Sequence, residues 1–363
     1  MFCHPRRGEA GERARAVRVR SSIGLVLAFA MGALALTAAS PAGPAAAGAV
    51  CPSPYRTVRL GTLGGAAGVP LALNDHGAVV GWSNTAGGAL HPFLWQHGRM
   101  TDLGTLDRVE GGWGMATDIN RNGVAVGQSD RGGVRHAVRW QGGKITDLGT
   151  LGGVSASAAA VNDHGVIVGG RTMPDGVLRA FLWRDGRLTD LDVPGGGDVV
   201  VTDINNSDQV VGFAMPTDRP AFAFLWQRGT VTVLPTSRYG GQARAINDRG
   251  VVVGKVFGAE GGLAVRWWRG GSTMLGTLPD GDASGARDIN DRGVILGAGN
   301  VGPHSLEDHA FLWDRGVLRD LDPARVPESA TALNNRGEII GTVPGPAGAG
   351  IAALFVPSAG SRR

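Results

Sequence analysis

The feature that most constrains the fold is a four-residue turn that recurs along the chain at nearly constant spacing. Its first residue is always Asn, and successive turns lie 46, 42, 43, 42, 43 and 44 residues apart. The turns begin at Asn74, Asn120, Asn162, Asn205, Asn247, Asn290 and Asn334. Such a regular period over most of a 363-residue chain indicates one repeat architecture rather than several separate domains.

Each repeat has the pattern of four short strands joined by two tight turns. A segment such as ARAIN leads into the Asn turn, and GVVVG, a variable loop, AFLW, a second turn and RLTDL follow. Asn at the first position and Gly at the fourth are typical of a type I turn, although the turn NNSD at Asn205 lacks the Gly. The second turn is predicted to be a hairpin because Gly occurs three residues after a Trp in six repeats. The Trp residues are Trp95, Trp140, Trp183, Trp226, Trp268 and Trp313.

The chain ends distinguish a closed ring from an open stack of repeats. Four strands in each repeat of this length predict a β-propeller, with an open β-solenoid as the alternative. Residues 55–65 match the fourth strand of a repeat, whereas the last segment, AALFVP, matches a third strand with Phe355 in place of Trp. Pairing these two segments completes the last repeat. We therefore predict an all-β, seven-bladed propeller of 28 strands, closed by its N-terminal strand.

Residues 1–49 have the pattern of a secretory signal peptide, which leaves residues 50–363 as a single propeller domain. The apolar run from Ser21 to Ala39 follows six arginines, and small residues precede a predicted cleavage site after Ala49. An uncleaved membrane anchor is the alternative, but the run is short for a spanning helix. The expected protein is secreted and extracellular, with no membrane insertion once the leader is removed.

The charge balance argues against a nucleic-acid partner. Without residues 1–49 the chain keeps 29 basic and 29 acidic residues, so no excess of positive charge remains to follow a phosphate backbone. Cys51 is then the single cysteine. An exported chain without a disulfide must rely on its own core, which more than 300 residues can provide. We expect a monomer.

Three recurring segments resemble the HAF repeat of predicted extracellular repeat proteins. They are HAFLW at 309–313, DLGTLGG at 147–153 and INDRGVVVG at 246–254, and related segments cover essentially the whole chain after the leader. The resemblance implies an extracellular repeat protein but brings no catalytic residue or ligand with it. His occupies the first motif position only at His91, His136 and His309, and the fifth repeat has two adjacent Trp residues, Trp267 and Trp268.

The loops between repeats are where we expect ligand binding. In an antiparallel blade the variable loops share one face, and the two tight turns of each repeat share the other. Loops on a rigid scaffold often carry function, and aromatic rings beside polar groups suit a sugar or peptide ligand. The alternative is that these rings pack between blades. The candidate binding residues are Trp82, Arg108, Glu110, Trp113, Arg238 and Tyr239.

Two sets of polar residues are candidates for a cation site. His304, Glu307, Asp308 and His309 offer imidazole and carboxylate ligands, but their spacing matches no established zinc motif, and a solvated loop is the alternative. Asp residues occur two positions before the turn Asn in alternate repeats, where the other repeats have Ala. They either face the channel and hold a cation or sugar, or accept backbone hydrogen bonds from a neighbouring blade. These residues are Asp118, Asp203 and Asp288.

No local motif of hydrolases, phosphate-binding loops or calcium loops occurs, and no cofactor is expected. The favoured hypothesis is a non-catalytic propeller that binds a glycan, peptide or surface partner through its loops. The alternative is a secreted hydrolase or lyase with a composite site at the channel mouth, and a purely structural protein is a third possibility. Convergence of His136, His309, Glu110 or the Asp set would favour catalysis.

Overall fold

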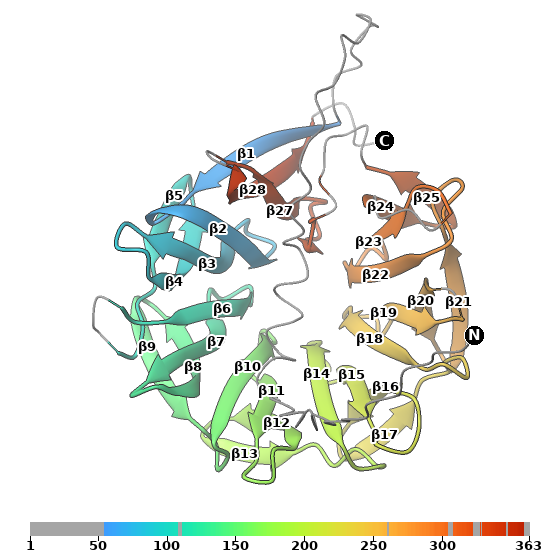
Figure 1. Cartoon of the computed structure of the whole chain (residues 1–363), viewed down its shortest axis with the longest axis horizontal. Helices are drawn as coiled ribbons and strands as arrows, with labels where there is room; N and C mark the ends of the chain where they lie inside the picture. Colours follow the sequence, from blue (N-terminus) through green and yellow to red (C-terminus); the bar gives the residue numbers. More distant parts are fainter. Residues whose placement is uncertain are drawn as a thin grey trace, which may run out of the picture.

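Seven four-stranded antiparallel sheets follow one another around a closed ring, as Figure 1 shows. The computed structural model describes residues 54–107, 111–259, 261–303, 308–321, 327, 329–345 and 348–358. The predicted seven-bladed, 28-stranded propeller is confirmed. The described residues contain no α-helix, and hence no helix that could cross a membrane. The predicted leader, residues 1–49, lies outside this part of the chain.

The strands of each blade follow the order of the chain, with the exception of blade 7. Blade 1 contains β2 (Gly64–Leu73), β3 (Val79–Thr85), β4 (Leu90–Gln96) and β5 (Arg99–Asp102). Blade 2 contains β6 (Gly114–Ile119), β7 (Ala125–Arg131), β8 (Val134–Gln141) and β9 (Lys144–Gly149). Blade 3 contains β10 (Ser155–Val161), β11 (Ile167–Thr172), β12 (Leu178–Arg184) and β13 (Arg187–Asp190). Blade 4 contains β14 (Asp198–Ile204), β15 (Val210–Met215), β16 (Phe222–Gln227) and β17 (Thr230–Val233).

The remaining blades complete the ring. Blade 5 contains β18 (Gly241–Ile246), β19 (Val252–Phe257), β20 (Gly262–Trp268) and β21 (Gly271–Gly276). Blade 6 contains β22 (Ser284–Ile289), β23 (Ile295–Asn300), β24 (Asp308–Asp314) and β25 (Val317–Asp320). Blade 7 contains β26 (Ala332–Leu333), β27 (Ile339–Pro344), β28 (Gly350–Pro357) and the N-terminal β1 (Tyr55–Gly61).

The N-terminal strand closes the ring as the chain ends predict. β1 pairs antiparallel with β28, with Tyr55 opposite Pro357 and Thr57 opposite Phe355. Phe355 pairs with Ile339 in the place that Trp takes in other blades, where Trp95 pairs with Val79. An open solenoid has no such pairing between its first and last strands. The closed ring therefore excludes the solenoid alternative.

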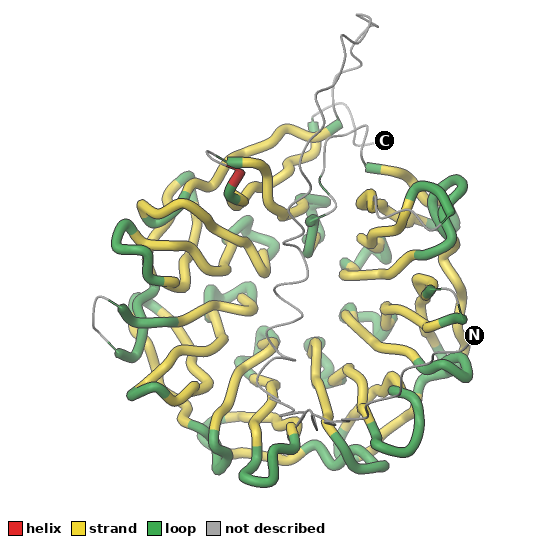
Figure 2. Tube along the Cα trace, in the orientation of Figure 1, coloured by secondary structure: helices red, strands yellow, loops and turns green. Residues whose placement is uncertain are grey.

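The strand directions separate two faces of the ring. The first strand of each blade lies innermost (Figure 1), and the next three lie progressively further out. Because all pairs are antiparallel, the loops between second and third strands and the links between blades lie at one end, which we call the loop face. The Asn turns and the outer hairpins lie at the other end, the turn face. Figure 2 shows these connections between the strands.

The outer hairpins use two-residue turns in which both central residues have positive φ. In blade 1 these are His97 at 52° and Gly98 at 79°, between the paired residues Gln96 and Arg99. This is the geometry of a type I′ turn, which matches the twist of a tight hairpin. Blade 5 uses the same geometry at Arg269 and Gly270.

The adjacent Trp residues of blade 5 change the predicted register by one position. We placed the turn Gly three residues after Trp268, but Trp267 takes the repeat position, because it pairs with Val252 and is 2% exposed. Trp268 is 48% exposed and lies beside the hairpin turn. The type I′ turn fixes this register, since Gly270 supplies its second positive φ.

A bulge in the first strand explains the Gly of the VVG motif. In blade 5 the pairing of β18 with β19 shifts between Ala243 and Ala245, which brings the backbone of β18 over Gly254. A Cβ on Gly254 would lie 2.0 Å from the carbonyl oxygen of Gln242. Such an approach excludes any side chain, so the motif requires Gly.

The core lies between the blades rather than within one sheet. Val168 of blade 3 and Val201 of blade 4, for example, belong to one buried apolar cluster. The repeat Trp adds a polar link to the previous blade. Trp140 Nε1 donates to the carbonyl of Gly104, at 3.1 Å, and Trp267 Nε1 donates to that of Pro235, at 2.6 Å. Every blade therefore depends on its neighbours for burial.

Candidate functional site

The turn face is held together by a closed belt of buried Asn side chains. Each turn Asn donates from Nδ2 to the backbone carbonyl of the corresponding Asn in the next blade, at 2.9 to 3.1 Å. The last contact, from Asn334 to Asn74, closes the circle at 3.1 Å. The sequence predicted the turn but not this Asn belt. The recurrence of Asn once in every repeat was the signal that could have suggested contacts between the turns of neighbouring blades.

A second ring of polar contacts links the same seven turns. The backbone N–H of Arg121 donates to Asp163 Oδ1 of the next blade, at 2.9 Å, and five other turns repeat this contact. We call the acceptors and Arg121 the turn ring. Its members are Asp75, Arg121, Asp163, Asn206, Asp248, Asp291 and Asn335.

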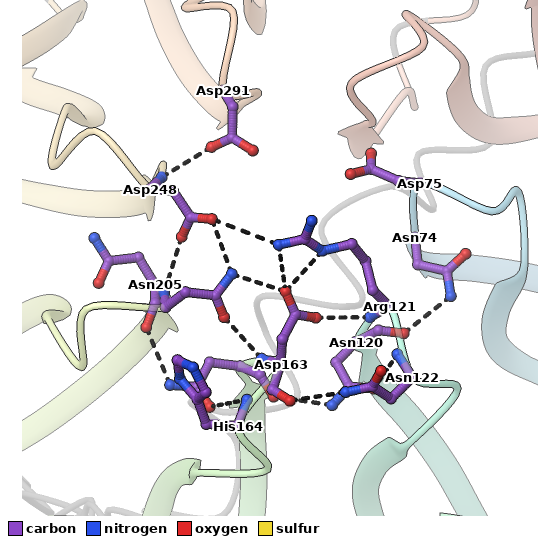
Figure 3. Close-up of polar contacts among 12 residues, drawn as sticks. Asn74, Asp75, Asn120, Arg121, Asn122, Asp163, His164, Asn205, Asp248 and Asp291 are labelled. Carbon is purple, nitrogen blue, oxygen red and sulfur yellow. Dashed lines mark hydrogen bonds and ion pairs between the residues drawn. The ribbon is translucent and has the colours of Figure 1, made fainter.

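Arg121 ties the turn ring together across the axis. Figure 3 shows its guanidinium between Asp163 and Asp248, which belong to blades 3 and 5. Arg121 Nη2 lies 2.7 Å from Asp163 Oδ2 and 3.8 Å from Asp248 Oδ2. Burial opposes ionisation of Asp163, but hydrogen bonds from Arg121 and Asn206 outweigh it, so the pKa of Asp163 lies below its ordinary value. Polar groups of the turn face are thus already engaged with one another.

The three alternating Asp residues join blades in pairs. Asp118 accepts the N–H of Ile119 through Oδ1 and the N–H of Val161, in the next blade, through Oδ2, both at 2.8 Å. Asp203 bonds Ile204 and Ile246 in the same way, and Asp288 bonds Ile289 and Leu333. The three carboxylates thus join blade 2 to blade 3, blade 4 to blade 5 and blade 6 to blade 7, whereas blade 1 lies outside these pairs. Of the two interpretations left open by the sequence, the structure supports backbone bonding to a neighbouring blade.

These carboxylates are costly to ionise inside the ring. Burial raises the pKa of Asp118 and of Asp288 to about 6, although two backbone hydrogen bonds to each act in the opposite direction. Burial also raises the pKa of Asp203 well above its ordinary value, and the charges of Asp118 and Asp288 add to this increase. The set is therefore an electrostatically coupled group.

Three histidines, each in the third strand of its blade, pair with the Asp eleven residues later in the fourth strand. His91 Nδ1 lies 2.7 Å from Asp102, His136 Nδ1 lies 2.8 Å from Asp147, and His309 Nδ1 lies 3.0 Å from Asp320. Asp102 and Asp147 also accept the N–H of the Gly two residues later. In blade 3 the corresponding Asp190 pairs with Arg171 at 2.5 Å. These contacts tie the outer strands together in blades 1, 2, 3 and 6.

The described part of the predicted cation loop does not form a metal centre. His309 is bound to Asp320, and Asp308 is exposed at the start of β24. His304 and Glu307 lie outside the described residues. Within the described ranges, no group of three His, Cys, Asp or Glu side chains is arranged to hold a metal ion.

Two of the predicted aromatic residues lie on the loop face, each with a guanidinium over its ring. Trp113 lies directly before β6 and is half-buried, with Arg135 4.4 Å from the ring centroid. Tyr239 is 41% exposed, and Arg238 lies 4.8 Å from its ring centroid and donates to its hydroxyl oxygen at 2.7 Å. Arg135 was missed by the sequence analysis because its partner lies 22 residues away.

The predicted binding residues do not form one site. Trp113 precedes blade 2 and Tyr239 precedes blade 5, so three blades separate them along the ring. Trp82 belongs to strand β3, where it pairs with Val69 and Pro92, and not to a loop. Arg108 and Glu110 lie outside the described residues. The described candidates on the loop face thus belong to two separate aromatic and guanidinium pairs.

The geometry does not assemble the composite catalytic site considered above. His136 and His309 lie in blades 2 and 6, and each is bound to an Asp of its own blade. The alternating Asp residues are bound to backbone N–H groups. Catalysis by a convergent acid and base has no support among these described residues.

Comparison with known proteins bears on the fold. No protein-family model matches the chain, and no curated protein sequence matches it. A puromycin-hydrolysing peptidase from Mycobacterium tuberculosis is similar in structure, with a TM-score of 0.53 and 12% identity over 84% of this chain and 52% of that chain.

Two archaeal structures give lower scores. The β-propeller domain of the Trilobed protease from Pyrococcus furiosus has a TM-score of 0.49 and 12% identity over 69% of this chain and 80% of that chain. The acylaminoacyl peptidase from Pyrococcus horikoshii has a TM-score of 0.48 and 14% identity, covering 69% of this chain and 44% of that chain. The chain thus spans about half the length of the two peptidases. At such identities the likeness concerns the propeller fold alone.

Proposed function

We propose that this protein is an exported, non-catalytic β-propeller that binds a glycan, peptide or surface partner through its loop face. The leader-like N-terminus and the resemblance to HAF repeats of predicted extracellular proteins support export. We propose further that the chain belongs to that repeat family and acts as a monomer outside the cell.

The observation that carries the proposal is the difference between the two faces. Polar groups of the turn face are bonded to one another in the Asn belt and the turn ring. The loop face instead presents Trp113 with Arg135 and Tyr239 with Arg238. An aromatic ring under a guanidinium provides a flat apolar surface edged by hydrogen-bond donors, which suits the face of a sugar or a peptide side chain.

The chain offers a matched pair of variants for the test. Trp113 and Trp268 each have an Arg at 4.4 Å from the ring, but Trp268 lies beside an outer hairpin on the turn face. The full-length protein would be screened against glycan and peptide arrays, and hits would be measured by isothermal titration calorimetry. We expect Trp113→Ala to weaken binding about tenfold or more, as for a central contact residue, and Trp268→Ala to leave it unchanged.

Two results would contradict this proposal. One is a complete absence of saturable binding in both arrays. The other is an equal loss of affinity in Trp113→Ala and Trp268→Ala, because equal losses would point to a general effect on the fold rather than to contact at the loop face.

A further inference from the structure

Blade 2 departs from the repeat at the end of its sheet that belongs to the loop face. Trp113 lies seven residues before the turn Asn, where the other blades have Ala67, Ser155, Asp198, Gly240, Ala283 and Pro327. Asp130 lies ten residues after the turn Asn, where the other blades have the uncharged residues Asn84, Thr172, Met215, Phe257, Asn300 and Pro344. Asp130 is paired with Arg135. An aromatic ring and an ion pair are thus gathered in one blade.

The three side chains form a row across neighbouring strands. Trp113 lies directly before β6, Asp130 in β7 and Arg135 in β8, and these strands are adjacent in blade 2 (Figure 1). The N–H of Asp130 donates to the carbonyl of Trp113 at 3.0 Å, and residues opposite each other in a sheet project to the same side. Arg135 Nε lies 3.5 Å from Asp130 Oδ1, and its guanidinium lies over the Trp113 ring. We call these three residues the blade 2 row.

The blade 2 row projects from the side of the sheet that faces blade 3. Ala137, two residues after Arg135, projects to the same side and packs in one apolar cluster with Ala156 of blade 3. Gln128 is paired with Ala137 and lies two residues before Asp130, so its side chain is on this side as well. Gln128 is buried, and no described residue donates to its Oε1. The protein beneath the row therefore contains an acceptor that lacks a donor.

The backbone around the row is short and firmly held. Gly132 and Gly133 alone connect β7 to β8, which is the shortest of the seven connections between second and third strands. Since neither residue has a side chain, this connection places no side chain over the row. Ser129 Oγ donates to the carbonyl of Trp113 and accepts the N–H of Leu106, both at 3.0 Å. The segment that carries the Trp ring is thus fixed to β7.

The ion pair makes the row electrically neutral and leaves it both donors and acceptors. Asp130 Oδ1 and Arg135 Nε are buried against each other, whereas 29% of the Asp130 side chain and 22% of the Arg135 side chain are exposed. The exposed groups are a carboxylate oxygen, which accepts, and guanidinium nitrogens, which donate. An anionic ligand would meet the Asp130 carboxylate, and a cationic ligand would meet Arg135. A hydroxyl group, which donates and accepts without charge, suits both.

We propose that the blade 2 row binds a neutral sugar residue. Adjacent sugar hydroxyls donate to Asp130 and accept from Arg135, and the apolar C–H groups of the sugar contact the exposed part of the Trp113 indole. The inference rests on the proposed function, because both place the ligand at Trp113. It narrows that function to a neutral glycan, in preference to a peptide or a charged ligand.

The repeat supplies a variant of the row that the fold already tolerates. The double substitution Asp130→Asn, Arg135→Leu gives blade 2 the residues that blade 1 carries at these positions, where Asn84 is opposite Leu90. It removes the ion pair and leaves the net charge of the protein unchanged. The single substitution Asp130→Asn keeps the shape of the side chain and serves in its place if the double variant melts well below the wild type.

The matched control removes an ion pair from the opposite face. Asp314 and Arg315 lie 3.7 Å apart at the outer hairpin of blade 6, on the turn face. The double substitution Asp314→Gln, Arg315→His gives this hairpin the residues that blade 1 carries there, Gln96 and His97. The net charge is again unchanged, so the two double variants differ in the face that they alter.

The experiment measures sugar binding to the full-length protein by isothermal titration calorimetry. The probes are glucose, galactose and mannose, each beside its uronate, with glucosamine as the cationic counterpart of glucose. We expect at least one neutral sugar to bind saturably and about tenfold or more tightly than its charged counterparts. We expect Asp130→Asn, Arg135→Leu to weaken this binding about tenfold or more, and the Asp314→Gln, Arg315→His control to change it less than about twofold.

Failure of this inference is distinguishable from failure of the proposed function. If no glycan and no peptide binds in the arrays described above, both are overturned. If a peptide or a charged sugar binds better than every neutral sugar and Trp113→Ala weakens that binding, the proposed function stands and the neutral-sugar site is overturned. The site is also overturned if the row variant, melting near the wild type, keeps its affinity, or if the control loses as much affinity as the row variant.

Discussion

A single residue type, the turn Asn, performs two structural tasks at once. In blade 5, Asn247 Oδ1 accepts the N–H groups of Arg249 and Val251, which shapes the turn within one blade. Its Nδ2 donates to the carbonyl of Asn290, which joins that blade to the next. The first task needs only an oxygen acceptor, and the second needs the amide donor.

Replacing Asn247 by Asp separates these tasks. We expect Asn247→Asp to keep the turn but to reduce the free energy of unfolding by about 1–3 kcal/mol, because a carboxylate would face the Asn290 carbonyl with no donor between them. Urea denaturation at neutral pH provides the measurement. Asn84→Asp, at a loop-face residue whose amide makes a 3.5 Å contact, is the control and should change the stability little. Equal stability of Asn247→Asp and the wild type would show that the Asn belt contributes nothing.

At the level of the element, the Asn turn of blade 4 departs from its repeat without losing its shape. The other turns end in a Gly of positive φ, such as Gly250 at 76°, but here Asp208 adopts a φ of 58°. The Asp208 carboxylate accepts from Asn162 Nδ2 at 2.9 Å and from Arg184 Nη2 at 2.6 Å. These two contacts, both of them to blade 3, offset the conformational cost of a non-Gly residue in this region.

Two substitutions at Asp208 separate the conformational cost of its positive φ from the stabilisation that its two side-chain contacts provide. Asp208→Ala keeps the unfavourable φ and removes both contacts, whereas Asp208→Gly removes the contacts and the strain together. We expect Asp208→Gly to be more stable than Asp208→Ala by about 1–2 kcal/mol. Chemical denaturation of both variants tests this order, and a Gly variant no more stable than the Ala variant would contradict the account.

At the level of the whole molecule, the three Asp residues make the ring sensitive to pH. The ordinary Asp pKa is 3.8, and Asp118 and Asp288 have values of about 6 in the folded ring. A raised folded pKa means that the folded state binds protons more tightly than the unfolded state. The resulting stabilisation is complete below pH 3.8 and is lost as the pH rises through about 6. Asp163, with a lowered pKa, affects stability only below this window.

We therefore expect the wild-type protein to gain about 1–3 kcal/mol of stability when the pH falls from about 7.5 to about 5. The Asp203→Ala variant should gain less, because it lacks one titrating group and relieves the repulsion that Asp203 exerts on its neighbours. Melting curves across this range at fixed ionic strength give the comparison. The control is Asp280→Asn, at an exposed turn position, and should follow the wild type. An identical gain in Asp203→Ala would rule out this origin of the pH dependence.

The amino-acid sequence by itself determined the number of blades, the four strands of each and the closure by the N-terminal strand. These features follow from local rules, because turn residues and strand patterns act over a few positions and simply repeat. The tight turn after Trp267 was misplaced by one residue, since two adjacent Trp residues fit the local pattern equally well. Pairing with Val252 decided between them.

Only the tertiary structure decided which side chains meet across blades. Nothing near Asp118 in the sequence indicates that its carboxylate reaches Val161, 43 residues away, or that Arg135 lies over Trp113. The repeat specified the scaffold because its turns and strands depend on residues that are close in sequence. The candidate sites depend on contacts between residues far apart in sequence, which form only when the ring closes.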